Sequence, residues 1–177
     1  ASLTPLSALA IGVLDDRAGL PAGVLSIVPG TSSSAIGKEF CENPVVRKLT
    51  FTGSTEVGRI LLSQAADQVM KVSMELGGNA PFIVFDDADL DAAAEGAIVS
   101  KYRNSGQTCV CANRIYVQAG VHDAFVEKLV EKTLQLKVGD GREKDVAQGP
   151  LIDKDAVANV EELLDDAKEK GAEVQLR

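Results

Sequence analysis

The sequence contains a single histidine, and this scarcity excludes much of the common chemistry of enzyme active sites. A Ser-His-Asp triad, a Cys-His pair or a metal site with several histidines would each have to use His122. His122 stands at the start of a segment with helical spacing of apolar residues, apart from any candidate catalytic cluster. We therefore interpret it as an ordinary residue at a helix start and predict no metal site.

Positive charge and long apolar runs are also scarce. The chain has 18 lysine and arginine residues against 26 aspartate and glutamate residues, and its formal net charge is −8. Without a basic field to gather phosphates, nucleic acid is not expected as a partner, although one or two arginines could still hold a small anion. No apolar run reaches about 18 residues, so no membrane span is expected.

Cysteine is rare, with three residues in the chain. An odd and small number does not make a disulfide framework and favours a reducing compartment, so we expect a cytoplasmic protein. Hydrophobic residues make up 45% of the sequence and charged residues 25%, which is typical of a folded globular chain.

Helical and strand-like spacing of apolar residues alternate along the chain. Strands that alternate with helices predict βαβ units and a largely parallel sheet, hence the α/β class. Because the chain opens at a helix start and closes on a strand, we expect a segment of a longer protein. The predicted helices are 5–19, 33–40, 53–66, 89–103, 121–136 and 153–170, and the predicted strands are 24–28, 46–51, 69–74, 81–85, 114–118 and 173–176.

Cys109 lies in a glycine-containing loop between a predicted helix and a predicted strand. Such a loop can present a thiol to a cleft, and nearby backbone N–H groups can stabilise the thiolate, which is the reactive form. With no histidine to deprotonate the thiol, activation would come from such dipoles or from a carboxylate acting through water. The residues alone leave two interpretations open: a nucleophile, or the commoner case of a buried and inert cysteine.

Four motifs resemble signatures of the aldehyde dehydrogenase family and stand in the family's order. They are FTGSTEVG at 51–58, MELGGN at 74–79, GQTC at 106–109 and QGPL at 148–151. The resemblance covers the whole chain. It implies an aldehyde dehydrogenase-like α/β fold, with a parallel Rossmann-type sheet portion in residues 1–75, the C-terminal part of an NAD(P)-binding domain. Residues 76–177 would be the N-terminal part of the α/β catalytic domain that carries the cysteine.

The resemblance implies a role for each of these motifs. Cys109 matches the catalytic nucleophile and Glu75 the general base that activates water, although position alone would make Glu75 a solvated carboxylate at a strand end. Gly53, Ser54 and Gly77 match cofactor-binding positions of the family, and Ser54 matches a contact to the pyrophosphate. Gly53 and Ser54 also open a predicted helix, and helix N-termini favour anions. The alternative for residues 53–54 is an ordinary helix start. An ATP loop is excluded, because no Gly-Lys-Ser/Thr follows.

Residues 103–111 are similar to the succinate-semialdehyde dehydrogenases within this family. In these enzymes an arginine at the position of Arg103 holds the distant carboxylate of the substrate, since guanidinium pairs with carboxylates bidentately. The alternative is an arginine that only ends a helix. In some of these enzymes a cysteine at the position of Cys111 forms a reversible disulfide with the catalytic cysteine, which would be Cys109 here. Ser2 replaces a glutamate of NAD-specific relatives, and serine would accept a 2′-phosphate, which favours NADP over NAD.

The predicted function is therefore the NAD(P)-dependent oxidation of an aldehyde, succinic semialdehyde above all. The expected partners are a small aldehyde substrate and, by resemblance, further copies of the full-length chain in a homo-oligomer. Three alternatives stay open: a segment without turnover, a broad-specificity aldehyde dehydrogenase and a thiol redox protein that uses Cys109 and Cys111. The absence of a CxxC motif at a helix start weighs against the redox protein.

Overall fold

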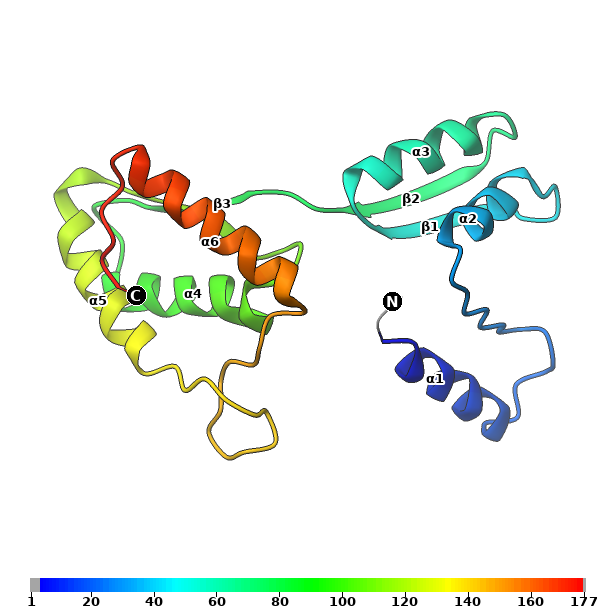
Figure 1. Ribbon diagram of the computed structural model, residues 1–177, viewed down its shortest axis with the longest axis horizontal. Coiled ribbons are helices and arrows are strands. Elements are labelled where there is room, and N and C mark those ends of the chain that lie inside the picture. The colour runs from blue at the N-terminus through cyan, green and yellow to red at the C-terminus, as the bar shows by residue number, and fades with distance from the viewer. Residues whose placement is uncertain (1–3, 177) are drawn as a thin grey trace. The chain divides into compact units, whose positions relative to one another are not determined.

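The structure is a computed structural model that describes residues 4–176, so Ser2 lies outside the described residues. The chain divides into two compact units, Ala1–Leu76 and Gly77–Arg177, and each is described by itself (Figure 1). Helices and parallel strands alternate in both units, as the sequence predicts for the α/β class. Whether these units correspond to the cofactor-binding and catalytic domains stays a prediction.

The first unit contains two parallel strands with a helix along them (Figure 1). Lys48 pairs with Lys71 at one end of this sheet and Gly53 with Leu76 at the other, so both strands end at the same edge. Alternating apolar residues on the strands meet the apolar face of α3 and α2, which builds the core. The elements are α1 (Pro5–Arg17), α2 (Ser33–Glu42), β1 (Lys48–Gly53), α3 (Thr55–Ala66) and β2 (Lys71–Leu76). The buried core residues are Cys41, Leu49, Leu61 and Ala65.

The second unit repeats this plan with a second parallel pair of strands. Strand β3 (Ala80–Val84) pairs with β4 (Ala112–Val117), and helices α4 (Leu90–Tyr102) and α5 (His122–Leu134) pack against each other. Asp89 caps α4, because its carboxylate accepts hydrogen bonds from the N–H groups of Asp91 and Ala92. Helix α6 (Lys154–Glu169) follows a connection of irregular structure. The buried core residues are Val84, Ala94, Ala97 and Phe125.

All six predicted helices are confirmed, and α5 begins at His122 as expected. The predicted strands at 24–28 and 173–176 are wrong, because neither segment pairs with another strand in the described part of the chain. Apolar spacing alone does not make a strand, because the backbone N–H and C=O groups of a strand need hydrogen-bond partners on a neighbouring strand. The side chains of Val24 and Val28 are 63% and 67% exposed, so no core holds the first segment either.

Within residues 4–176, no helix has both the length and the apolar character that crossing a membrane would require.

Candidate active site

Cys109 lies at the tip of a tight turn between two ordered elements. The turn spans Thr108 to Cys111, and the N–H of Cys111 donates to the carbonyl of Thr108 at 3.2 Å. It follows the short helix η1 (Arg103–Gly106) and leads directly into β4. The turn leaves Cys109 exposed, so the interpretation of this residue as a buried cysteine is wrong, while its role as a nucleophile stays a prediction.

The other two cysteines are packed inside the protein. Cys111 is 1% exposed, with its Sγ 2.7 Å from the hydroxyl of Thr108, and it donates to the carbonyl of Arg103 at 3.6 Å. Cys41 is fully buried and donates to the carbonyl of Leu61 at 3.7 Å. Burial, with a smaller effect from Glu42, raises the pKa of the Cys41 thiol. All three thiols are free in this structure, and the disulfide between Cys109 and Cys111 stays a prediction.

We expect iodoacetamide to label Cys109 in the native protein well before Cys41 and Cys111. Alkylation needs an accessible thiolate, and two of the three thiols are buried, one of them with a raised pKa. Peptide mass spectrometry after short exposures measures the three rates, and a sample unfolded in urea serves as the control in which all three react. Equal native labelling of Cys109 and Cys111 would show that the described turn does not persist in solution.

Arg103 occupies the C-terminal end of α4 and its side chain is exposed. Within residues 4–176 its guanidinium makes no hydrogen bond or ion pair with another side chain. Its backbone carbonyl, in contrast, is held by the Cys111 thiol at 3.6 Å. The backbone of this arginine is therefore tied to the cysteine turn, while its charge is available to an anionic ligand.

Glu75, Gly53 and Ser54 lie at one edge of the first sheet. Glu75 is exposed near the end of β2 and pairs in register with Thr52, next to Gly53. Ser54 follows and caps α3, with its hydroxyl accepting from the N–H of Val57 at 3.3 Å. A Cβ on Gly53 would overlap the ring of Phe51, so a side chain at this position would force the ring to move.

This edge fits the pyrophosphate of a dinucleotide. The carboxyl ends of parallel strands are where open α/β sheets bind ligands, and the first turn of α3 directs backbone N–H groups outward there. The hydroxyl proton of Ser54 stays available as a donor, because the cap uses the oxygen as an acceptor. The role of Ser54 as a cap, which the sequence left as an alternative, is thus compatible with a cofactor contact.

The end of the glutamate motif contacts the exit of the cysteine loop. The amide of Asn113 donates to the carbonyl of Gly78 at 3.3 Å and to the side chain of Asn79 at 3.1 Å. The guanidinium of Arg114 donates twice to the carbonyl of Asn79, at 2.6 and 3.1 Å. These bonds join residues 78–79 to β4, whereas a Cβ on Gly77 would meet no described atom within 4 Å. Its predicted cofactor contact stays a prediction.

Two residues that precede Cys109 contact a distant segment that the sequence did not single out for this purpose. The hydroxyl of Ser105 donates to the carbonyl of Gly149 at 3.1 Å, and Gln107 accepts from the N–H of Ile152 at 2.8 Å. The QGPL motif at 148–151 was the available signal, although nothing in it indicates which loop it contacts. The described residues include no group of three or more side chains suited to a metal ion.

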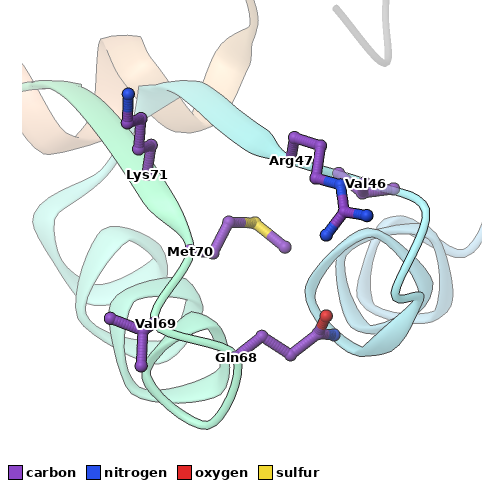
Figure 2. Close-up of a pocket in the computed structure, with 6 residues that line it drawn as sticks. All are labelled: Val46, Arg47, Gln68, Val69, Met70 and Lys71. Atoms are coloured by element: carbon purple, nitrogen blue, oxygen red, sulfur yellow. The ribbon is translucent and has the colours of Figure 1, made fainter.

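A hollow of about 340 Å³ lies elsewhere in the first unit. Figure 2 shows Met70 at its centre, with the side chains of Arg47 and Gln68 beside it. The hollow is lined by Arg47, directly before β1, and by Lys71, the first residue of β2. It therefore lies at the amino ends of the strands, opposite the edge that carries Glu75 and Ser54.

Comparisons with known proteins give one answer. The model of the aldehyde dehydrogenase family matches residues 1–176. A glutarate-semialdehyde dehydrogenase of Pseudomonas aeruginosa and an NADP(+) succinate-semialdehyde dehydrogenase of Escherichia coli are each 63% identical over 174 residues. Each alignment covers 98% of this chain and 36% of the relative.

The crystal structure of an NADP-dependent enzyme of E. coli superposes with a TM-score of 0.96 at 62% identity, over 99% of this chain and 36% of that chain. The chain thus spans about 36% of the length of the relatives it matches. With its motifs, its two parallel sheets and its exposed cysteine, the chain belongs to the aldehyde dehydrogenase family.

Proposed function

We propose that the full-length protein with this sequence oxidises succinic semialdehyde to succinate with NADP or NAD. Cys109 is the nucleophile and Glu75 the general base. The observation that carries the proposal is the contrast between the cysteines, because Cys109 alone of the three is exposed, at a turn tip, within the family's cysteine motif. The 63% identity to semialdehyde dehydrogenases supports the substrate class.

The reaction divides into two halves at Cys109. Its thiolate attacks the aldehyde carbon and forms a tetrahedral thiohemiacetal, whose oxyanion is stabilised by the backbone N–H of Cys109. The nicotinamide cofactor, when bound, supplies the acceptor for the hydride that leaves this carbon, and a thioester remains on Cys109. Glu75 takes a proton from water, the water oxygen attacks the thioester carbon, and collapse releases the carboxylic acid and restores the thiolate.

Gly53, Ser54 and Gly77 would hold the cofactor, and the N-terminus of α3 would favour its anionic pyrophosphate. Ser2, which favours NADP, lies outside the described residues, and the relative from E. coli is named for NADP(+). Comparing kcat/KM for NADP and NAD in the full-length protein decides between the two. Homo-oligomeric assembly and a cytoplasmic location stay predictions from the sequence.

Arg103 is proposed to pair with the carboxylate of the substrate. Replacing it with alanine should lower kcat/KM for succinic semialdehyde by about tenfold to a hundredfold, which corresponds to a charge-assisted hydrogen bond of about 1.5–3 kcal/mol. Butanal, which has the same chain length and no charge, should be spared, because it never used this pairing. Steady-state rates with both aldehydes measure the effect.

Arg17→Ala is the matched control, because Arg17 also ends a helix on an exposed surface, in the other unit. It should leave both substrates unchanged. An equal fall for both aldehydes in Arg103→Ala would mean that Arg103 only shapes the cysteine loop. The function would then be that of a broad-specificity aldehyde dehydrogenase.

A further inference from the structure

The cysteine loop is attached to the segment 149–152 by two hydrogen bonds that flank Gly106. On one side the Ser105 hydroxyl donates to the carbonyl of Gly149 at 3.1 Å. On the other side the side-chain oxygen of Gln107 accepts from the N–H of Ile152 at 2.8 Å. The residues joined by the second bond are 45 positions apart in the sequence. Gln107 stands two residues before the proposed nucleophile.

The backbone next to these two bonds has an unfavourable conformation that needs support. Asn104 and Ser105 have φ angles of 51° and 56°, in the left-handed region that side chains disfavour. Such residues persist where the surroundings over-determine them. Gln107 contributes to this as well, since its side-chain amide and its backbone N–H donate to the carbonyl of Asn104 at 3.2 and 3.1 Å. One side chain therefore holds both the strained residue and the distant segment.

The distant segment is itself anchored. The N–H of Gly139 donates to the carbonyl of Gln148 at 3.0 Å, and the N–H of Gln148 donates to the carbonyl of Lys137 at 3.1 Å. Residues 137–139 follow the end of α5, which packs against α4. Pro150 then favours an extended backbone at Gly149. The cysteine loop, which follows α4, is therefore bonded to segment 149–152. Residue 148 of the same stretch is bonded to the residues after α5, and α5 packs against α4.

We propose that Gln107 is a positioning residue that fixes the Cys109 turn for attack on the aldehyde, an inference that rests on the proposed function of Cys109. Gln107 acts through the turn and does not touch the substrate. Its side-chain oxygen is the atom that matters most, because it makes the shorter bond and the one to the distant segment. A displaced thiol would lose the alignment that attack on a carbonyl carbon requires.

The test compares Gln107→Met, which keeps the length of the side chain without its hydrogen bonds, with Gln107→Glu, which keeps the acceptor for Ile152. Gln135→Met is the matched control, because Gln135 is exposed in the same unit and its side chain makes no hydrogen bond within residues 4–176. Rapid mixing of the full-length protein with aldehyde and NADP measures the burst of reduced cofactor. We expect Gln107→Met to slow the burst by about tenfold to a hundredfold, with the KM for cofactor within about twofold.

Gln107→Glu should recover most of the burst rate, because its carboxylate keeps an acceptor for the N–H of Ile152. If Gln107 only stabilised the fold, Gln107→Met would lower the midpoint of unfolding. It would not slow the burst while leaving the KM for cofactor unchanged. A burst rate in Gln107→Met within about twofold of the unmodified protein overturns the proposal, and so does a failure of Gln107→Glu to recover. If Gln107→Met does not fold, Ser105→Ala removes the other bond and is judged by the same limits.

A readout without turnover separates this inference from the proposed function. In Gln107→Met the loosened turn should let iodoacetamide reach Cys111, which is buried in the native turn. Unchanged protection of Cys111 contradicts the positioning role. Absence of any burst in the unmodified protein refutes the proposed function instead, and the labelling of Cys111 still shows whether Gln107 holds the turn.

Discussion

Replacing Cys109 with alanine removes aldehyde-dependent reduction of the cofactor by the full-length protein, with kcat falling by at least about a thousandfold. The reason is chemical. Without the thiolate no thiohemiacetal forms, so no tetrahedral carbon holds a hydride ready to leave. Absorbance of the reduced nicotinamide, followed at saturating succinic semialdehyde, measures the loss.

Cys41→Ala is the control for this variant. Cys41 is fully buried in the first unit and contacts the backbone of Leu61, so its loss should affect stability and leave the rate per folded molecule largely intact. Circular dichroism gives the folded fraction of both variants, and each rate is divided by the concentration of folded protein. Comparable loss of activity in the two would remove the assignment of Cys109 as the nucleophile.

Replacing Glu75 with glutamine should separate the two halves of the reaction. Acylation of Cys109 does not need a base for water, so rapid mixing should still show a burst of reduced cofactor. Hydrolysis of the thioester does need one, and the steady rate after the burst should fall by about a hundredfold or more, as for the loss of a general base.

Glu127→Gln is the matched control, because Glu127 is an exposed carboxylate on α5 that makes no hydrogen bond or ion pair within residues 4–176. It should leave the burst and the steady rate unchanged. Loss of the burst in Glu75→Gln, with later steps unaffected, would point to another base and would move Glu75 to the first half of the reaction.

Elements whose signals are local were predictable from the sequence. Helices α3, α4 and α6 each begin at a side-chain cap, Ser54, Asp89 and Asp153, followed by apolar residues at helical spacing. The segment 24–28 has equally apolar residues but no partner strand in the described chain, and pairing depends on residues far away in the sequence. Composition could not tell this segment from a true strand.

The candidate site divides in the same way. From the sequence, Cys109 could be either a buried residue or a nucleophile. The structure shows that Cys109 is exposed and that Cys41 and Cys111 are buried. The left-handed residues Asn104 and Ser105 precede a glycine, which is a local signal for a turn. The bond from Ile152 to Gln107 had no local signal, because it depends on how residues 137–152 return to the cysteine loop.

The most direct test of the central claim is to isolate the thioester on Cys109. Glu75→Gln in the full-length protein is mixed with succinic semialdehyde and NADP, quenched in acid during the slow phase, digested and analysed by peptide mass spectrometry. We expect a succinyl group on the peptide at Cys109, in an amount that matches the burst of reduced cofactor. A burst without any succinyl adduct, or an adduct on Cys111 or Cys41, would contradict the proposed role of Cys109.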